Sequence, residues 1–380
     1  MNHDYNQEAL DLHKENRGKI ETKTKVPLEN RDDLSRAYTP GVAEVCKEIA
    51  RDPANAREYT LKRNTVAIVS DGSAILGLGN LGALAAIPVM EGKAAILKSF
   101  AGVDAFPICL DTQDTEEIIK AVKQLAPVFG AVNLEDIAAP RCFEIEERLR
   151  KELSIPVMHD DQWGTATVVL GGLINALKVT GRGEGKDAKI VVNGVGSAGV
   201  ATSRLLLAYG FKNILFCDSK GIIHEGREDL TKEKKELISA SALKGTEGQL
   251  ADAVQGADVF VGVSKAGALT AEMAKSMNKD SIVFALANPI PEIMPDVAKE
   301  AGVAVIATGR SDFPNQLNNS LIFPGLFKGV LDYNIKQFDI SMFTKAALAL
   351  ANHVKNPIAE DILPNMFDKQ LVNVIAETVK

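Results

Sequence analysis

Short apolar runs alternate with longer segments of helical periodicity along most of the chain. Such runs, rich in Val, Ile and Ala, are typical of parallel strands that are buried on both faces. The periodic segments between them predict helices that cover the sheets. The runs form two groups, 66–70, 95–97, 106–110, 131–134 and 156–158, followed by 189–193, 213–217, 259–263, 282–285 and 303–307.

Two groups of strands predict two α/β domains. We expect an N-terminal α/β substrate domain over residues 1–160 and a Rossmann-type doubly wound parallel sheet over residues 161–345, followed by a C-terminal helical segment over residues 346–380. A helix of small and apolar residues, 165–179, is expected to bridge the domains. The charged segment 231–249 interrupts the second pattern, and we interpret its Lys- and Glu-rich start as a solvated face rather than a binding site.

A glycine motif follows the first strand of the second group. Gly194 permits a tight turn, Gly196 lets the backbone approach a pyrophosphate, and Gly199 allows close packing of helix and strand. The helix that follows offers free N–H groups to that anion, and the next strand ends on an acid that can accept hydrogen bonds from ribose hydroxyls. The predicted dinucleotide site comprises Gly194, Gly196, Ser197, Ala198, Gly199 and Asp218.

Composition narrows the class of partner. The net charge of −7 argues against nucleic acid, because phosphate binding needs a basic face. No apolar window of about 18 residues suggests a membrane span. The N-terminus is polar and unlike a signal peptide, and the four cysteines show no CxxC spacing. We therefore expect a cytoplasmic protein with reduced thiols that acts on a small molecule.

Two pairs of acids follow two strands of the first group, Glu135-Asp136 and Asp160-Asp161. Ligands of open α/β sheets bind beyond the carboxyl ends of the strands, so both pairs could meet in one crevice. Carboxylates without His or Cys suit Mg²⁺ or Mn²⁺. The alternative is helix capping, by Asp136 through Ile137 and by Asp160 or Asp161 near Gly164. The spacing leaves both interpretations open.

Single polar residues beside these features have two interpretations each. Lys93 precedes an apolar run and could lose its charge by desolvation to act as a base, although most lysines point into water. Tyr38 lies in a Thr-Pro-Gly turn, where it could simply pack. Asn288 follows a late strand, and Asn319 follows a second asparagine; both could bind a carboxylate substrate or form turns.

Six motifs follow one another along the chain. They are Tyr38-Thr39-Pro40-Gly41-Val42, Glu91-Gly92-Lys93-Ala94-Ala95, Asn133-Leu134-Glu135-Asp136, His159-Asp160-Asp161-Gln162-Trp163-Gly164-Thr165-Ala166, Ala287-Asn288-Pro289 and Asn319 with Phe323-Pro324-Gly325. Together and in this order they resemble the motifs of the malic enzymes, and most closely those of the short bacterial NAD(P)-dependent, oxaloacetate-decarboxylating branch. The resemblance covers nearly the whole chain from about residue 18. Trp163 occupies a variable position of the Asp-Asp-Gln-x-Gly-Thr motif.

The resemblance implies that malate is oxidised at C2 by NAD(P)⁺ and that the resulting oxaloacetate loses CO₂ to give pyruvate. It also implies a homodimer, with the N-terminal helical region through Val42 as a candidate interface. The implied roles are Glu135, Asp136 and Asp161 as ligands of Mg²⁺ or Mn²⁺, Lys93 as general base, Tyr38 as the acid that protonates C3, and Asn288, Asn319 and Asp160 around the substrate, with Asn288 also beside the cofactor.

The sequence leaves the cofactor and the reaction open. Asp218 should repel the 2′-phosphate of NADP and so favours NAD, but Lys220 follows two residues later and could pair with that phosphate. Redox-neutral relatives, an oxaloacetate decarboxylase or a malolactic-type enzyme, share the same motifs. A non-catalytic nucleotide sensor is the third hypothesis, which the proton-transfer residues argue against.

Overall fold

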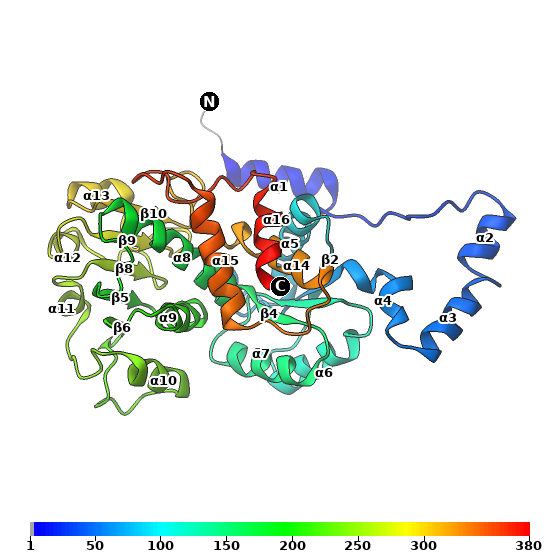
Figure 1. Ribbon diagram of the computed structural model, residues 1–380, viewed down its shortest axis with the longest axis horizontal. Coiled ribbons are helices and arrows are strands. Elements are labelled where there is room, and N and C mark those ends of the chain that lie inside the picture. Colours follow the sequence, from blue (N-terminus) through cyan, green and yellow to red (C-terminus); the bar gives the residue numbers. More distant parts are fainter. Residues whose placement is uncertain (1–3) are drawn as a thin grey trace.

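Two parallel sheets, one after the other in the chain, organise the computed structural model (Figure 1), which describes residues 4–380. The first three residues of the polar N-terminus, for which we expect no signal peptide, lie outside the described part. The predicted fold class, an α/β domain followed by a Rossmann-type doubly wound sheet, is confirmed. No helix within residues 4–380 combines the length and apolar character needed to cross a membrane.

The first sheet has four parallel strands in the order β2-β1-β3-β4. Every residue of β1, β3 and β4 is buried, which explains the largely apolar runs in the sequence. The strands are β1 (Thr65–Ser70), β2 (Asp104–Cys109), β3 (Ala131–Leu134) and β4 (Val157–His159).

The helices beside this sheet include one that the sequence misassigned. Residues 95–97, predicted as a strand, belong to the end of α5 (Ala83–Ile96) and the π-helical turn η2 (Leu97–Ala101). A short apolar run has no period that separates a buried helix from a buried strand. Helix α6 (Thr115–Leu125) begins after Asp114, which caps it by accepting the Glu117 N–H, and α7 is Arg141–Glu152.

The second sheet has the order β10-β9-β8-β5-β6-β7. The chain leaves β5 on one side through β6 and returns to β8 on the other, so the strand order reverses beside β5, where doubly wound folds bind ligands. Its strands are β5 (Ile190–Asn193), β6 (Ile214–Asp218), the short antiparallel β7 (Gly221–Ile222), β8 (Val259–Gly262), β9 (Ile282–Ala285) and β10 (Val305–Thr308), and its helices are α9 (Ser197–Tyr209), α10 (Lys232–Ala240), α11 (Leu250–Val254), α12 (Ala271–Lys275) and α13 (Pro295–Glu300).

Helix α8 (Asp160–Val179) joins the two halves. It begins five residues earlier than predicted, directly after β4, and packs against both α9 and α15 (Ile340–His353). One cluster of buried apolar side chains runs from the first sheet through α8 to the second. The two sheets therefore share a continuous core.

The last helices return to the first half of the molecule. Helix α14 (Phe323–Asp332) contacts β3 and the turn η1 (Leu61–Asn64), and it also packs on α16 (Leu371–Ala376). Between α15 and α16 the chain is irregular. The short turns η3 (Asn319–Leu321) and η4 (Glu377–Val379) complete this region.

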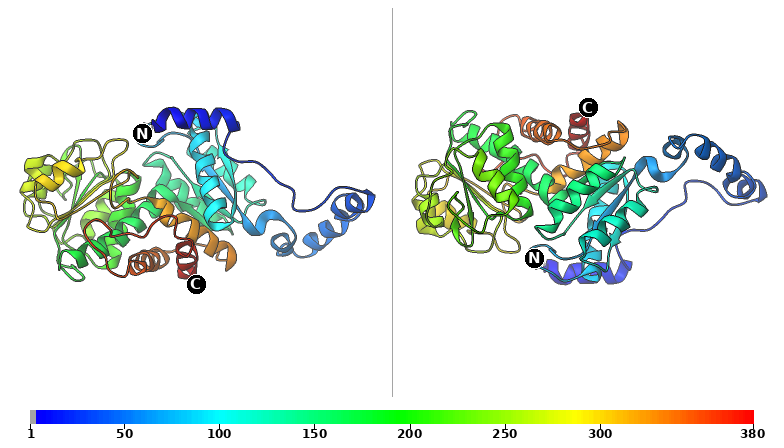
Figure 2. Two further views of the ribbon diagram at one scale, coloured as in Figure 1. Left: turned by 90° about the horizontal axis from the view of Figure 1, so that it is seen from above. Right: turned by 90° about the horizontal axis from the view of Figure 1, so that it is seen from below.

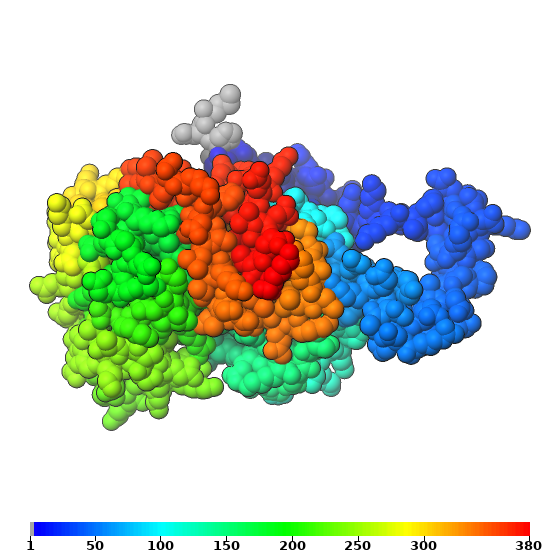
Figure 3. Space-filling view, viewed as in Figure 1, coloured from blue at the N-terminus to red at the C-terminus, as the bar shows by residue number. Residues whose placement is uncertain are grey.

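The N-terminal segment contains a projecting arm. Helices α2 (Arg31–Ala37) and α3 (Val42–Arg51) extend beyond α4 (Asn55–Tyr59), away from both sheets, in all views (Figures 1 and 2), whereas α1 (Tyr5–Asn16) lies along the body. In the space-filling view an open gap separates the arm from the body (Figure 3). Helix α3 buries no residue within this chain although its sequence is amphipathic.

Candidate active site

The two acid pairs of the sequence meet at one edge of the first sheet. Strands β3 and β4 pair in parallel with Leu134 opposite His159, so that Glu135 and Asp160 follow at the same level. One ligand oxygen from each of Glu135, Asp136 and Asp161 lies within 4.8 Å of the others. The Asp136 N–H donates to Asp161 Oδ2 at 2.8 Å, and Asn133 Nδ2 donates to Glu135 Oε2 at 2.9 Å.

Helix capping does not account for these acids. No helix begins at Ile137, because α7 starts at Arg141 after Pro140. Asp160 and Asp161 lie inside the first turn of α8 instead of capping it, and the N-cap residue His159 makes no side-chain cap bond. The capping alternative is therefore wrong for both pairs.

The three carboxylates are arranged to hold a cation. Burial, together with the neighbouring carboxylates, raises the pKa of Asp136 to about 9, and burial raises the pKa of Glu135 to about 7. Asp136 Oδ2 is buried without a hydrogen-bond partner. Three hard oxygen ligands that repel one another in a dry site are the donor set that Mg²⁺ or Mn²⁺ would satisfy.

Lys93 lies on helix α5, not at the mouth of a strand as predicted, and it faces the same acids. Its Nζ pairs with Asp160 and with Glu135 Oε1, the latter at 2.9 Å, and lies 4.4 Å from the centre of the Phe323 ring. Burial alone would lower the pKa of Lys93, but the carboxylates outweigh it and hold that pKa above its ordinary value. Lys93 is thus a buried ammonium whose charge depends on the carboxylates around it.

The two predicted asparagines occupy different places near this cluster. Asn319 begins η3, and its side chain lies near that of Asp160, because a Cβ at Gly164 would contact both. Asn288 follows β9, and its carbonyl approaches Gly77, in the loop after β1, so closely that a Cβ there would overlap it. Asn288 therefore lies where the two halves of the molecule touch.

The predicted glycine turn joins β5 to α9, which begins at Ser197, directly after Gly196. Gly194 has φ of +105°, and a Cβ at Gly199 would overlap the Gly194 carbonyl oxygen. A Cβ at Gly196, in contrast, would meet nothing within 4 Å. The open side at Gly196 and the helix N-terminus at Ser197 and Ala198, which has no side-chain cap, fit a pyrophosphate.

Asp218 ends β6 as predicted, but its carboxylate already accepts hydrogen bonds from within the chain. Arg227 donates two, and Lys234 and the Lys220 N–H donate one each. Lys234 belongs to the segment that we interpreted as a solvated face. That interpretation is wrong for Lys234, because its side chain turns inward to Asp218 and is only 18% exposed.

Tyr38 does not join the other predicted residues. It ends α2 on the projecting arm and is 66% exposed. Helix α5, which carries Lys93, lies in the body of the molecule (Figure 1). Within one chain the site therefore contains the proposed base but not the proposed acid.

Several residues around the site escaped the sequence analysis. Glu146 is buried on α7 and accepts hydrogen bonds from the His159 N–H, Gln162 and Trp163, so it fixes the start of α8. Glu292 accepts the N–H groups of Ser264 and Ala287 and so ties the segments after β8 and β9 together. Neither acid belongs to a motif, and only the folded chain reveals their partners.

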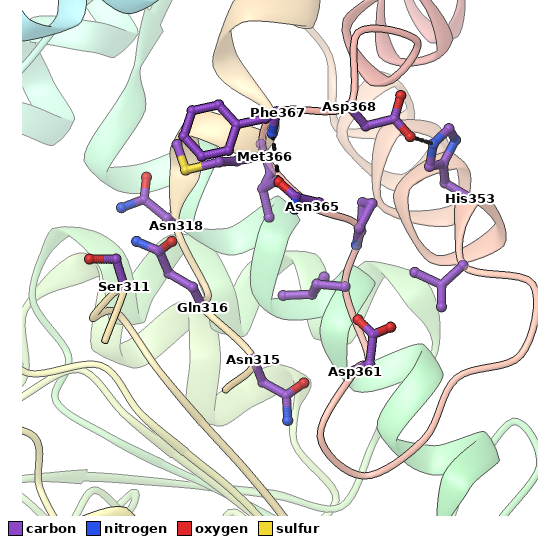
Figure 4. A pocket seen from close by; sticks show the side chains of 14 residues that line it. Ser311, Asn315, Gln316, Asn318, His353, Asp361, Asn365, Met366, Phe367 and Asp368 are labelled. Carbon is purple, nitrogen blue, oxygen red and sulfur yellow. Dashed lines mark hydrogen bonds and ion pairs between the residues drawn. The ribbon is translucent and has the colours of Figure 1, made fainter. Parts of the chain in front are cut away.

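A cavity of about 900 Å³, lined by both polar and apolar side chains, adjoins this region between the segment after β10 and the irregular segment after α15 (Figure 4). Asn318 lines it, whereas the next residue, Asn319, contacts Asp160. On its wall His353 Nε2 pairs with Asp368 at 2.8 Å. None of the three clustered carboxylates lines the cavity, so it is a neighbour of the cation site and not the site itself.

Comparison with known proteins assigns both halves of the chain to one protein family. The family model "Malic enzyme, N-terminal domain" matches residues 17–117 and 112–150, and "Malic enzyme, NAD binding domain" matches residues 163–379. The bifunctional malic/malolactic enzyme of Bacillus subtilis (strain 168) is 54% identical over 376 residues, which cover 98% of this chain and 92% of that protein. The NAD-dependent malic enzyme of Geobacillus stearothermophilus is 54% identical over 367 residues, covering 95% and 76%. The crystal structure of the NAD-dependent malic enzyme from Thermotoga maritima matches with a TM-score of 0.94 at 46% identity, covering 98% of each chain.

Proposed function

Because this chain belongs to the malic enzyme family of NAD- and NADP-dependent oxidoreductases, we propose that it converts L-malate to pyruvate and CO₂ and reduces NAD(P)⁺ with the help of a divalent cation. The observation that carries the proposal is the convergence of Glu135, Asp136 and Asp161 beside buried Lys93. An oxygen-rich cluster next to a potential base is what oxidation and decarboxylation of a hydroxy-dicarboxylate require.

Glu135, Asp136 and Asp161 would hold Mg²⁺ or Mn²⁺, which supplies Lewis-acid polarisation of the substrate oxygen. With their lone pairs engaged by the cation, the same three carboxylates would be poor proton acceptors, which would leave the substrate proton to Lys93. Glu135 and Asp136 are buried, which limits the water that would otherwise screen the site.

Lys93 would accept the C2 hydroxyl proton of malate as hydride leaves for the nicotinamide. A lysine can do so only when it is neutral. Asp160 and Glu135 keep it charged while their own charges are uncompensated. Neutralising the carboxylate cluster removes that stabilisation, and the Phe323 ring and the surrounding burial then favour the neutral amine.

Tyr38 would protonate C3 of the enol formed on loss of CO₂, and we propose that it does so across a homodimer. Its own arm holds it away from Lys93, and the amphipathic helix α3 has no buried residue within the described part of the chain. Leu34 and Tyr38 are also exposed on the arm. A second subunit that covers this arm would bring Tyr38 of the partner subunit to the site.

The nucleotide would lie along the turn from Gly194 to Gly199 at the edge of the second sheet. Asn288 would stand between the nicotinamide and the substrate, and Asn319 would donate its amide to a substrate carboxylate beside Asp160. We further propose that the protein is cytoplasmic, and its division at residues 160/161 and 345/346 stays a prediction.

A redox-neutral reaction is the second candidate, either oxaloacetate decarboxylation or a malolactic conversion. The name of the Bacillus subtilis relative, a bifunctional malic/malolactic enzyme, favours keeping it. The same cation site and the same Lys93 would serve either reaction.

One assay separates the candidates. The purified protein is mixed with malate, Mn²⁺ and NAD⁺ or NADP⁺, and the absorbance of the reduced cofactor is followed together with pyruvate and lactate. We expect reduced cofactor and pyruvate in equal amounts, and no reaction with excess EDTA. Lactate without reduced cofactor would favour the malolactic alternative, and pyruvate only from added oxaloacetate would favour the decarboxylase.

A further inference from the structure

The carboxylate of Asp218 has no acceptor capacity left for a ribose. Its Oδ1 accepts from Arg227 and from the Lys220 N–H, both at 2.9 Å. Its Oδ2 accepts from Arg227 at 2.8 Å and from Lys234 Nζ at 2.7 Å. A carboxylate offers about four lone-pair positions, so these four donors saturate it. The ribose hydroxyls of NAD would have to displace one of them.

The donors are held firmly. The side chains of Asp218, Arg227 and Lys234 are 15%, 10% and 18% exposed, respectively. The donated hydrogen bonds outweigh partial burial and lower the pKa of Asp218 to about 2. Asp218 thus stays ionised, and its negative charge is compensated by side chains of the same chain.

A second acid belongs to this cluster, but the net charge of the cluster stays positive. Arg227 also pairs with Asp229 at 2.8 Å, and Lys220 Nζ pairs with Asp229 at 2.7 Å. Three cations therefore face two carboxylates, which leaves one net positive charge. The Arg227 guanidinium donates its hydrogen bonds to the two acids. Each lysine ammonium, in contrast, donates only one of its three hydrogens to them.

The cluster lies where the ribose of a bound dinucleotide would be. Strand β6 pairs with β5 with Cys217 opposite Asn193, and the Gly194 N–H donates to the Cys217 carbonyl at 2.9 Å. Asp218 is therefore adjacent to the glycine turn. In this fold the acid at the end of the second strand meets the 2′-hydroxyl of the adenosine ribose.

We infer that Lys234, with Lys220 beside it, binds the 2′-phosphate of NADP, and that Arg227 acts as a positioning residue that neutralises Asp218. The inference rests on the proposed function and names the form of its cofactor. An unpaired Asp218 would repel that phosphate and bind ribose hydroxyls, but the paired one does neither. A phosphate dianion offers several strong acceptor oxygens to the unused ammonium hydrogens.

The test uses calorimetry to measure how tightly the protein binds the adenosine half of the cofactor, with AMP and adenosine 2′,5′-bisphosphate as the ligands. We expect the bisphosphate to bind the wild-type protein at least ~10-fold more tightly than AMP, as expected for one or two hydrogen bonds to charged groups. Lys234→Ala should weaken binding of the bisphosphate about 10- to 100-fold and leave binding of AMP unchanged. Lys234→Arg should restore most of the lost affinity.

Arg227→Ala should reverse the preference, because Asp218 is then free to bind ribose and to repel phosphate. Lys232→Ala is the matched control, since Lys232 lies on the same helix but is 69% exposed and pairs with Glu147 instead. Equal binding of the two ligands to the wild type, or equal weakening of both by Lys234→Ala, would overturn the inference. If the bisphosphate preference holds while malate is not oxidised, the proposed function fails and this inference stands.

Discussion

At the scale of single residues, the charge state of Lys93 is the central chemical question. The residue is buried among acids that stabilise its ammonium form. A pair of carboxylates normally keeps a lysine charged. Lys93 can therefore become a neutral base only when the negative charge of those carboxylates is compensated. This explains why the base and the cation ligands have to be neighbours.

Substituting Lys93 by Ala should lower kcat about 10²–10⁴-fold, the usual contribution of a general acid–base residue. Lys93→Arg should be as inactive, because a guanidinium keeps its proton at any working pH. Lys98→Ala, at an exposed lysine that pairs with Asp104, should be as active as the wild type. Initial rates with malate, together with circular dichroism to verify folding, provide the measurement. Substantial activity in the Arg variant would exclude Lys93 as the base.

The cation cluster predicts a pH-dependent stability. Burial raises the pKa of Glu135 to about 7 and that of Asp136 to about 9. Because the pKa values are raised in the folded state, the stabilisation is complete below the unfolded pKa near 4 and is lost as pH rises from there to about 7 for Glu135 and to about 9 for Asp136. Without added cation, the melting temperature should therefore fall over this range.

Adding Mn²⁺ should remove this dependence, because the ion binds the ionised carboxylates. At about 100 times its Kd it should stabilise the protein by about 2.7 kcal/mol. Differential scanning fluorimetry at pH 6 and pH 9, with Mn²⁺ or EDTA, measures both effects. Asp161→Asn is the informative variant, since it removes one ligand. Equal Mn²⁺ stabilisation of this variant and the wild type would contradict the assignment.

At the scale of secondary structure elements, the turn between β5 and α9 uses its glycines for two different purposes. Gly199 is needed for packing, because a Cβ there would overlap the Gly194 carbonyl oxygen. Gly196 has φ of −87° and open space in the position of a Cβ, so nothing in the protein itself requires a glycine. The second glycine is explained by a ligand.

Gly199→Ala should therefore reduce the stability of the protein, whereas Gly196→Ala should reduce its affinity for the nucleotide. Gly199→Ala should cost about 1–3 kcal/mol of stability, as overpacking usually does. Gly196→Ala should melt like the wild type but bind nucleotide at least ~10-fold more weakly, because its methyl group occupies the approach of the pyrophosphate. Thermal unfolding and calorimetry with NAD⁺ distinguish them. Tight nucleotide binding by Gly196→Ala would contradict the predicted position of the pyrophosphate.

At the scale of the whole molecule, the arm of α2 and α3 is the feature that one chain cannot explain. A helix without buried residues is marginal in isolation, and α3 would gain stability by covering its apolar face. Tyr38 lies on this arm, and Lys93 lies in the body. A homodimer would solve both problems with one interface.

Mixing two inactive variants tests this arrangement. Tyr38→Phe and Lys93→Ala should each be inactive alone. If each site takes Tyr38 from the partner subunit, a mixed dimer concentrates both substitutions in one site and leaves the other intact. Unfolding and refolding an equal mixture should then restore about a quarter of wild-type activity, by random pairing of subunits.

The Tyr38→Phe protein refolded alone and the Lys93→Ala protein refolded alone are the controls. Size-exclusion chromatography with light scattering should give a dimer in each case. An inactive mixture of verified dimers would mean that Tyr38 and Lys93 act from the same chain or that Tyr38 has no catalytic role.

The sequence by itself determined the properties that depend on short stretches of chain. Burial on both faces makes strand β9 apolar throughout and β1 and β3 mostly apolar, and the periodic segments beside them predict the helices. The glycine turn and the acid pairs follow from local chemistry in the same way. The prediction of a strand at residues 95–97 is wrong, because three apolar residues are too few to show either a helical or a strand period.

Only the tertiary structure decided which partners these residues have, because contacts between distant segments leave no local pattern. Lys93 meets Asp160 across 67 positions of the sequence. Asp218 is neutralised by Arg227 and Lys234, and Lys234 belongs to a segment that resembles an ordinary solvated surface in the sequence. Tyr38 belongs to a shared motif, but its place on a projecting arm depends on how the body folds around the two sheets.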